Sequence, residues 1–153
     1  MRSLWLVPRG EGALSKTLAI IQARQTSSRL PGKALADVRG KPLVERVVDR
    51  VKLARNLDGI VLAVPDTPKN DALWEFAHVE MGWVCFPGPE DDVLGRYVTA
   101  AKLYDADPIV RVTADCPFLD PGVIDGVVNL FRRGECDYAA NNLARSVPSR
   151  PGR

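Results

Sequence analysis

Short apolar runs rich in β-branched residues alternate along this chain with segments that have the periodicity of amphipathic helices. The apolar runs lie at 17–23, 59–64, 83–86 and 108–113, with a weaker one at 137–140, and the helical segments lie at 42–54, 69–80, 90–101 and 121–133. Continuous apolar runs are typical of strands buried on both faces, and their alternation with helices predicts a mainly parallel sheet. We therefore expect an α/β fold of the doubly wound type, with helices on both faces of the sheet in a three-layer αβα arrangement.

The length of 153 residues corresponds to about one domain, which we expect to span 15–145. Residues 1–14 are predicted to be an extension outside the fold. They include Leu6-Val7-Pro8-Arg9-Gly10, which resembles a thrombin-cleavage linker, and the alternative is a mis-called start with translation beginning near residue 14 or 15. The tail, 146–153, is rich in Pro, Ser, Gly and Arg and is predicted to be disordered.

The loop after the first predicted strand concentrates positive charge. Arg24, Arg29 and Lys33 lie within ten residues, with hydroxyl side chains at 26–28 between them. In parallel sheets, ligands bind beyond the carboxyl ends of the strands. Guanidinium forks, an ammonium and hydroxyl donors at such an end suit a triphosphate. A solvated basic loop is the alternative interpretation.

Two common phosphate-binding loops do not fit this segment. The P-loop pattern would require Gly at position 27 and Ser or Thr at position 34, where Ser27 and Ala34 stand. The chain also contains no G-x-G-x-x-G segment, which disfavours a dinucleotide site.

A carboxylate follows the strand predicted at 108–113. Asp115 would lie at the tip of a buried strand, where an aspartate can hold Mg²⁺ and leave the other coordination positions to phosphate and water. The alternative is an aspartate that stabilises a turn. Asp120 precedes Pro121 and is better explained as the N-cap of the next helix.

The segment 88–97 has a structural and a functional interpretation. Its acidic residues, at 90–92, suit the positive end of a helix dipole, so a helix start explains them. A ligand contact by Arg96 or Tyr97 is the alternative. The helical spacing predicts an inner face made of Leu94, Tyr97, Val98 and Ala101.

Composition argues against several classes of function. The cysteines, Cys85, Cys116 and Cys136, are odd in number and show no C-x-x-C spacing, so we expect buried, reduced thiols rather than disulfides or a zinc site. His78 is the only histidine, which disfavours a Ser-His-Asp triad, and we expect it to be a surface or packing residue. The net charge of +2 gives no argument for nucleic acid. No apolar run approaches a membrane helix or a signal peptide, which predicts a cytoplasmic protein.

Four segments resemble, in order and context, the motifs of the spore-coat-polysaccharide-F-like cytidylyltransferases, which group with the acylneuraminate and KDO cytidylyltransferases. They are IIQARxxSSRLPGK at 20–33, GKPL at 40–43, EDDVLxRY at 90–97 and VRVTADCPFLDP at 110–121. The first of these is highly specific. The resemblance runs from about residue 16 to residue 142 and implies a Rossmann-like nucleotidyltransferase fold.

The resemblance also implies a reaction and a site. A sugar-acid hydroxyl would attack the α-phosphorus of CTP with Mg²⁺ bound, which releases pyrophosphate and requires no protein nucleophile. The residues that it assigns to the nucleotide are Ala23, Arg24, Ser28, Arg29, Lys33 and Thr113. Among these, Arg24 and Lys33 are expected to act in catalysis together with Asp115, the metal ligand, and Ala23 to approach the base.

Members of this family normally continue past the point where this chain stops, with an insertion for sugar contacts and dimerisation and a second acidic metal ligand. We therefore expect a C-terminally truncated protein, in which a homodimer would lack its usual contact region. Two alternatives stay open. One is an inactive nucleotide-binding fragment, and the other is an NTP:sugar-phosphate nucleotidyltransferase. The latter typically carries a G-x-G-[ST]-R-x-x-P-K loop, and Ala23 at a glycine position favours the cytidylyl branch.

Overall fold

The computed structural model describes residues 16–133 and 136–141. A sheet with the strand order β3-β2-β1-β4 forms its centre, and all neighbouring strands are parallel. The strands are β1 (Lys16–Gln22), β2 (Gly59–Pro65), β3 (Cys85–Gly88) and β4 (Ala106–Thr113). Between and after them lie α1 (Leu43–Val51), α2 (Asp71–Trp74), α3 (Val93–Leu103) and α4 (Pro121–Phe131), with the short turns η1 (Lys33–Leu35), η2 (Pro68–Asn70) and the π-helical η3 (Glu75–Glu80).

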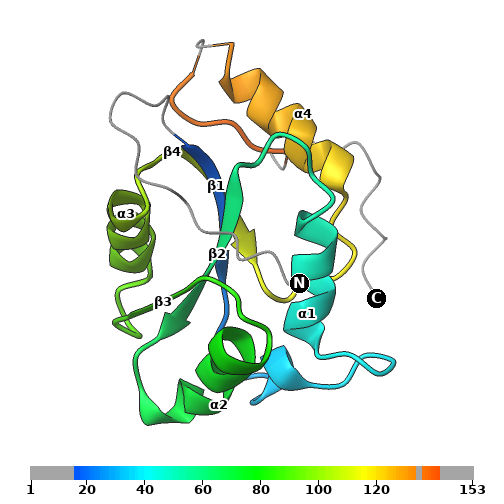
Figure 1. Ribbon diagram of the computed structural model, residues 1–153, viewed down its shortest axis with the longest axis vertical. Coiled ribbons are helices and arrows are strands. Elements are labelled where there is room, and N and C mark those ends of the chain that lie inside the picture. Colours follow the sequence, from blue (N-terminus) through cyan, green and yellow to red (C-terminus); the bar gives the residue numbers. More distant parts are fainter. Residues whose placement is uncertain (1–15, 134–135, 142–153) are drawn as a thin grey trace, which may run out of the picture.

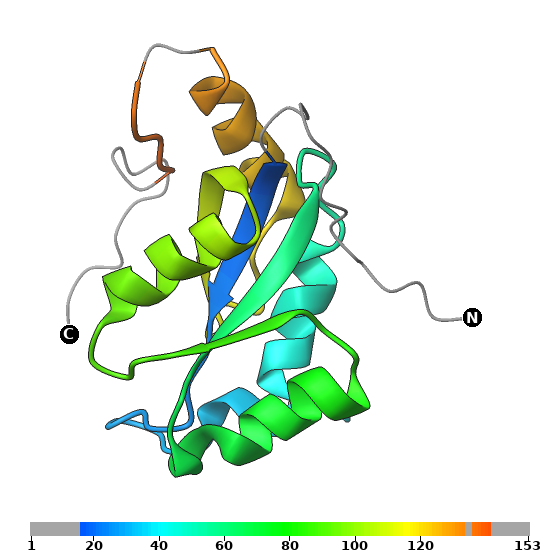
Figure 2. The same ribbon diagram turned by 60° about the vertical axis from the view of Figure 1, so that its left-hand side comes forward.

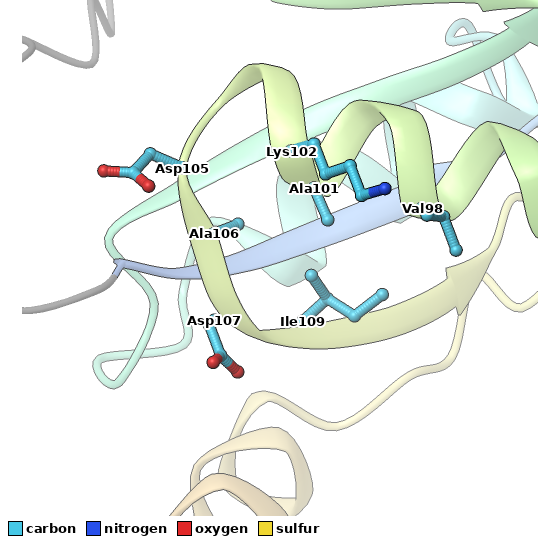
Figure 3. A pocket seen from close by; sticks show the side chains of 7 residues that line it. All are labelled: Val98, Ala101, Lys102, Asp105, Ala106, Asp107 and Ile109. Atoms are coloured by element: carbon cyan, nitrogen blue, oxygen red, sulfur yellow. The ribbon is translucent and has the colours of Figure 1, made fainter.

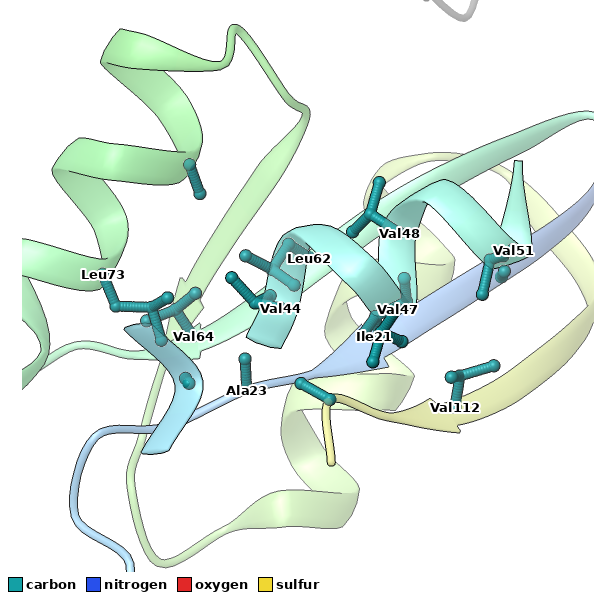
Figure 4. Packing of buried hydrophobic residues seen from close by; sticks show 14 of the residues in the cluster. Ile21, Ala23, Val44, Val47, Val48, Val51, Leu62, Val64, Leu73 and Val112 are labelled. Carbon is teal, nitrogen blue, oxygen red and sulfur yellow. The ribbon is translucent and has the colours of Figure 1, made fainter. Parts of the chain in front are cut away.

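Helices cover both faces of the sheet (Figures 1 and 2). The helix α3 packs on one face, and α1, α2 and α4 pack on the other. The larger core joins α1 to the sheet, where Val44, Val47 and Val51 face Ile21 and Leu62 (Figure 4). The predicted three-layer αβα fold with a parallel sheet is therefore confirmed.

Burial explains why the central elements form where they do. The middle of β1, from Leu18 to Ile21, is fully buried because helices cover both sides of this strand. In α1, the buried positions are 44, 47, 48 and 51, a spacing that gives one continuous apolar stripe. No helix in the described ranges is long and apolar enough to cross a membrane.

The predicted inner face of α3 is wrong in part. Tyr97 is buried as expected, but Leu94 is 73% exposed and Val98 is exposed as well. The buried positions are instead Arg96, Tyr97 and Ala100. The buried side of α3 is therefore rotated about the helix axis relative to the predicted one. The hydrophobic pattern did not indicate this because a charged residue, Arg96, occupies the inner face.

Two strand predictions also need correction. The third strand begins at Cys85 instead of residue 83, because the N–H of Trp83 donates to the carbonyl of Ala77, within η3, 2.9 Å away. No strand forms at 137–140, where the chain does not pair with the outer edge of β4. The predicted extension 1–14 and tail 146–153 lie outside the described residues.

Candidate functional site

The polar loops singled out in the sequence meet at one edge of the sheet. Because the strands are parallel, the loops after β1, β2, β3 and β4 all leave from their carboxyl ends, which lie together in Figures 1 and 2. This is the edge at which ligands bind in open α/β sheets. The segments that form it are 23–33, 66–70, 89–92 and 114–120.

An ion pair connects the first and last of these loops. Lys33 Nζ lies 2.7 Å from Asp115 Oδ2, although the two residues are 82 positions apart. The hydrogen bond from Lys33, and after it one from Thr113, lowers the pKa of the Asp115 carboxyl below its ordinary value. The structure thus brings together three of the predicted site residues, Lys33, Thr113 and Asp115. The side chains of Lys33 and Asp115 are both partly open to solvent.

The loop after β1 has a defined backbone. The N–H of Gly32 donates to the carbonyl of Gln25 at 2.9 Å, and the N–H of Lys33 donates to that of Leu30 at 3.3 Å. Gly32 adopts a left-handed conformation, with φ of +75°, which glycine tolerates best. The Leu-Pro-Gly-Lys sequence is therefore a turn that sets the direction in which Lys33 leaves the loop.

The remaining predicted residues of this loop lie at its surface or its root. Arg24, Ser28 and Arg29 are exposed. Ala23 is buried, and its N–H donates to the carbonyl of Ala63 on β2, 3.1 Å away. The exposed cations have the accessibility that a triphosphate-binding role needs.

Asn70 is a site residue that sequence reasoning missed. Its side chain is buried, with Oδ1 accepting from the N–H of Gln25 and Nδ2 donating to Thr67 Oγ1, each at 2.8 Å. Thr67 in turn donates to the Glu90 carboxylate, which also accepts from Thr26 Oγ1. One network thus joins the loops after β1, β2 and β3. No local sequence pattern indicates that Asn70 joins these loops, because an Asn at the start of a helix is normally interpreted as its N-cap.

Arg96 lies under the loop that follows β3. It is 1% exposed, and its Nη1 donates to the carbonyls of Pro89 and, at 2.9 Å, of Glu90. Its Nε and Nη2 have no hydrogen-bond partner in the described structure. Burial is the main cause that lowers the pKa of this guanidinium, and the nearby Arg24 adds to it. A side chain at Gly88 would collide with Arg96, since a Cβ there would lie 2.7 Å from its Cγ.

Other side chains have structural roles. Asp120 caps α4 as predicted, accepting from the N–H of Gly122 at 2.7 Å, and Asp92 caps α3 in the same way. Tyr97 donates its hydroxyl to the carbonyl of Val112 inside the core. His78 is exposed, as expected, and its ring packs against that of Trp74.

The expectation that all the cysteines are buried is wrong for Cys116, which is exposed at the turn after β4. Its Sγ lies 3.8 Å from Thr113 Oγ1, so it lies beside the predicted site. Cys116 lies in the turn region between β4 and α4, which leaves its side chain exposed to solvent. Cys85 is partly buried, and burial raises the pKa of its thiol to about 12.

We predict that Cys116 reacts with a thiol reagent such as DTNB and that Cys85 reacts far more slowly. The thiolate is the reactive form, and at pH 8 a raised pKa leaves little of it at Cys85. Single-cysteine variants that keep one of these two residues give the separate rates, measured by absorbance. Equal rates in the native protein would contradict the burial of Cys85, and rates in denaturant supply the control.

A cavity of about 410 Å³ lies outside this site, between α3 and the beginning of β4 (Figure 3). Its lining consists of Val98, Ala101, Lys102, Asp105, Ala106, Asp107 and Ile109. The beginning of β4 is at the opposite edge of the sheet from Asp115. This cavity therefore does not belong to the loops described above.

Comparison with known proteins places the chain in a family. A family model described as cytidylyltransferase matches residues 18–147. The chain belongs to the cytidylyltransferase family. This confirms the resemblance drawn from the sequence motifs, and the match includes both motif loops of the site.

Two curated relatives show which kinds of cytidylyltransferase this chain is similar to. It is 35% identical over 130 residues to an 8-amino-3,8-dideoxy-manno-octulosonate cytidylyltransferase of Shewanella frigidimarina. This match covers 81% of this chain and 51% of the relative. It is 33% identical over 129 residues to the spore coat polysaccharide biosynthesis protein SpsF of Bacillus subtilis, covering 82% and 53%. The chain thus spans about half the length of the curated relatives that it matches.

A solved structure supports the fold assignment. A cytidylyltransferase from Leptospira borgpetersenii superposes with a TM-score of 0.74 at 33% identity, over 80% of this chain and 51% of that protein. The parallel sheet and its helices therefore have the arrangement of a nucleotidyltransferase of this family.

Proposed function

We propose that this chain is the nucleotide-binding part of an enzyme that transfers a cytidylyl group from CTP to the hydroxyl of a sugar acid, for surface polysaccharide biosynthesis. The products would be a CMP-sugar and pyrophosphate. The observation that carries the proposal is the contact between Lys33 and Asp115, which joins the two motif loops at the ligand-binding edge of a cytidylyltransferase fold. The names of the two relatives support a sugar acid and a polysaccharide pathway.

The loop cations would hold and polarise the triphosphate. Arg24 and Arg29 are exposed and can each give paired N–H donors to phosphate oxygens, while Lys33 supplies a point charge. Negative charge grows on the α-phosphoryl oxygens and on the leaving pyrophosphate as the sugar hydroxyl attacks. Fixed positive groups stabilise that charge more than they stabilise the ground state.

The donor set at Asp115 fits Mg²⁺. A carboxylate is the hard oxygen ligand that this ion prefers, and the ion commonly takes only one or two carboxylates and fills its other positions with phosphate and water. Within 16–133 and 136–141, no group of three or more His, Cys, Asp or Glu could hold a metal without such help. When bound, Mg²⁺ would neutralise phosphate charge, and Asp115 would orient it toward the nucleotide.

We expect CTP with Mg²⁺ to raise the melting temperature of the chain more than ATP, GTP or UTP does. A ligand that binds only the native state stabilises it by about 2.7 kcal/mol at a hundredfold excess over Kd. Differential scanning fluorimetry with the four nucleotides at one concentration measures this. Equal shifts would remove the preference for cytosine, and the absence of any shift would contradict nucleotide binding.

Replacing Asp115 with Asn should remove the Mg²⁺-dependent part of CTP binding and leave a weaker, metal-independent part. Asn keeps the size and one oxygen but loses the charge that a hard cation favours. Titrations of both proteins with CTP, with and without Mg²⁺, give the result. If Mg²⁺ improved binding equally in both, Asp115 would not be the metal ligand. Asp120→Asn, at the cap of α4, is a matched control.

A second candidate function is nucleotide binding without turnover. The chain spans about half the length of the curated relatives that it matches, so the turnover of those whole proteins stays a proposal for it. Measuring CTP binding together with pyrophosphate release in the presence of a sugar acid separates the two. The cytoplasmic location and a homodimer stay predictions, and size-exclusion chromatography with light scattering tests the latter.

A further inference from the structure

A pocket of about 100 Å³ lies at the amino ends of β2 and β3. Its lining includes Gly59 and Ile60, the first residues of β2, and Trp83 and Val84, which come directly before β3. The loops of the candidate nucleotide site leave from the carboxyl ends of the strands, at the opposite edge of the sheet. This pocket is therefore separate from the candidate nucleotide site.

The floor of the pocket is apolar. Val48 and Val51 of α1 and Leu62 of β2 line it, and each is at most 2% exposed (Figure 4). The backbone around it is paired within the protein, since the N–H of Leu62 donates to the carbonyl of Val84 at 2.9 Å. The pocket thus offers mainly hydrocarbon surface to an occupant. Such a lining favours an apolar group over water.

Trp83 forms an aromatic wall of this pocket. It follows Gly82, which has a φ of +64°, so a turn at this glycine sets the direction in which the indole leaves the chain. The ring of Phe76 contacts the indole edge to face, with centroids 5.9 Å apart and an interplanar angle of 87°. An indole held in this way can pack against another aromatic ring in an offset or edge-to-face arrangement.

Lys52 supplies a positive charge beside the aromatic wall. In the part of the chain that the structure describes, it is the charged residue of the lining, and its Nζ lies 5.5 Å from the centroid of the Trp83 ring. It forms no ion pair with another described residue. The side chain is exposed, so its ammonium lies where the pocket meets solvent. An anionic group at this position would have a cation within reach.

We propose that this pocket binds a small aromatic carboxylate, with the ring against Trp83 and the carboxylate at Lys52. An enclosed apolar cavity of about 150 Å³ holds one benzene molecule, so the smaller pocket here takes a single ring and leaves the substituent at the surface. Ligand sites typically combine an apolar lining with a few polar groups that fix orientation. The inference does not depend on the proposed function, because the pocket lies at the other edge of the sheet.

A titration of the full chain with 4-fluorobenzoate, followed by ¹⁹F NMR, tests the proposal. The neutral analogue 4-fluorobenzyl alcohol has the same ring and lacks the charge. We expect a Kd on the order of 1 mM for the carboxylate, which is reasonable for a ligand of this size. The alcohol should bind up to about fivefold more weakly, because it forms no ion pair with Lys52.

Two variants assign the binding to this pocket. Ala54→Leu adds side-chain volume to a lining residue and should lower the affinity for both compounds by about tenfold or more. Lys52→Gln should remove the preference for the carboxylate and change the affinity for the alcohol by less than about twofold. Lys102→Gln is the matched control, because Lys102 is also exposed and lines the cavity beside α3. If Ala54→Leu fails to fold, as judged by circular dichroism, Lys52→Gln carries the test.

Four results would overturn the proposal. They are the absence of measurable 4-fluorobenzoate binding, equal affinity of the wild-type chain for the acid and the alcohol, unchanged affinity in folded Ala54→Leu, and a loss of affinity in Lys102→Gln. Competition with inorganic tripolyphosphate is a further check, because the cations of the loop that carries Lys33 could also attract a carboxylate. We expect tripolyphosphate to leave 4-fluorobenzoate bound, and displacement would place the compound at that loop instead.

Discussion

Replacing Lys33 with Met is expected to lower the affinity of the chain for CTP by about ten- to hundredfold, since hydrogen bonds to charged groups contribute about 1.5–3 kcal/mol. Lys33 is the cation that the turn at Gly32 directs toward Asp115, at the edge where the phosphates would lie. The substitution removes one phosphate contact and also leaves Asp115 without its partner. Calorimetric titration with CTP and Mg²⁺ measures the loss.

The fold should survive this change. The ion pair is partly exposed, and exposed pairs contribute about 0–1 kcal/mol to stability, so the melting temperature should move little. Lys41→Met is the matched control, because Lys41 pairs with Glu45 and Asp49 beside α1 and outside the site. If Lys33→Met left the CTP affinity unchanged, the alternative interpretation of this loop as a solvated basic segment would hold.

Replacing Asn70 with Ala should affect both stability and binding. The side chain is buried and satisfies the N–H of Gln25, so its removal leaves that donor unpaired at a cost of about 1–3 kcal/mol. It also frees the start of the loop that carries Arg24 and Lys33, which should weaken CTP binding. Chemical denaturation gives the stability, and titration gives the affinity.

Asn70→Asp separates the two hydrogen bonds of this side chain. It keeps the oxygen that accepts from Gln25 and loses the donor to Thr67, so it should bind CTP better than Asn70→Ala. Asn56→Ala also loses side-chain hydrogen bonds, but these join it to Asp125 and Asn129 on α4, so it should lower stability without changing affinity. Equal CTP affinity in wild type and Asn70→Ala would show that this network does not position the loop.

The free-energy cost of burying polar groups explains which residues of the candidate site the sequence indicated. The residues recognised from sequence, such as Lys33 and Asp115, follow strands and remain open to solvent, where charge is expected and needs no special partner. Asn70 and Arg96 were missed or left undecided because polar residues in helical segments are normally exposed. Their burial depends on acceptors and donors supplied by other loops.

The sequence by itself determined the alternating elements, the parallel sheet and the two motif loops, because apolar periodicity and turn residues act over a few neighbouring positions. It could not determine the rotation of α3, the late start of β3 or the absence of a strand at 137–140, since each depends on competing contacts. Only the tertiary structure decided that Lys33 meets Asp115 and that Gln25, Asn70, Glu90 and Arg96 gather around one loop. Such contacts join residues far apart in the chain, and parallel strand pairing is what brings them to the same edge.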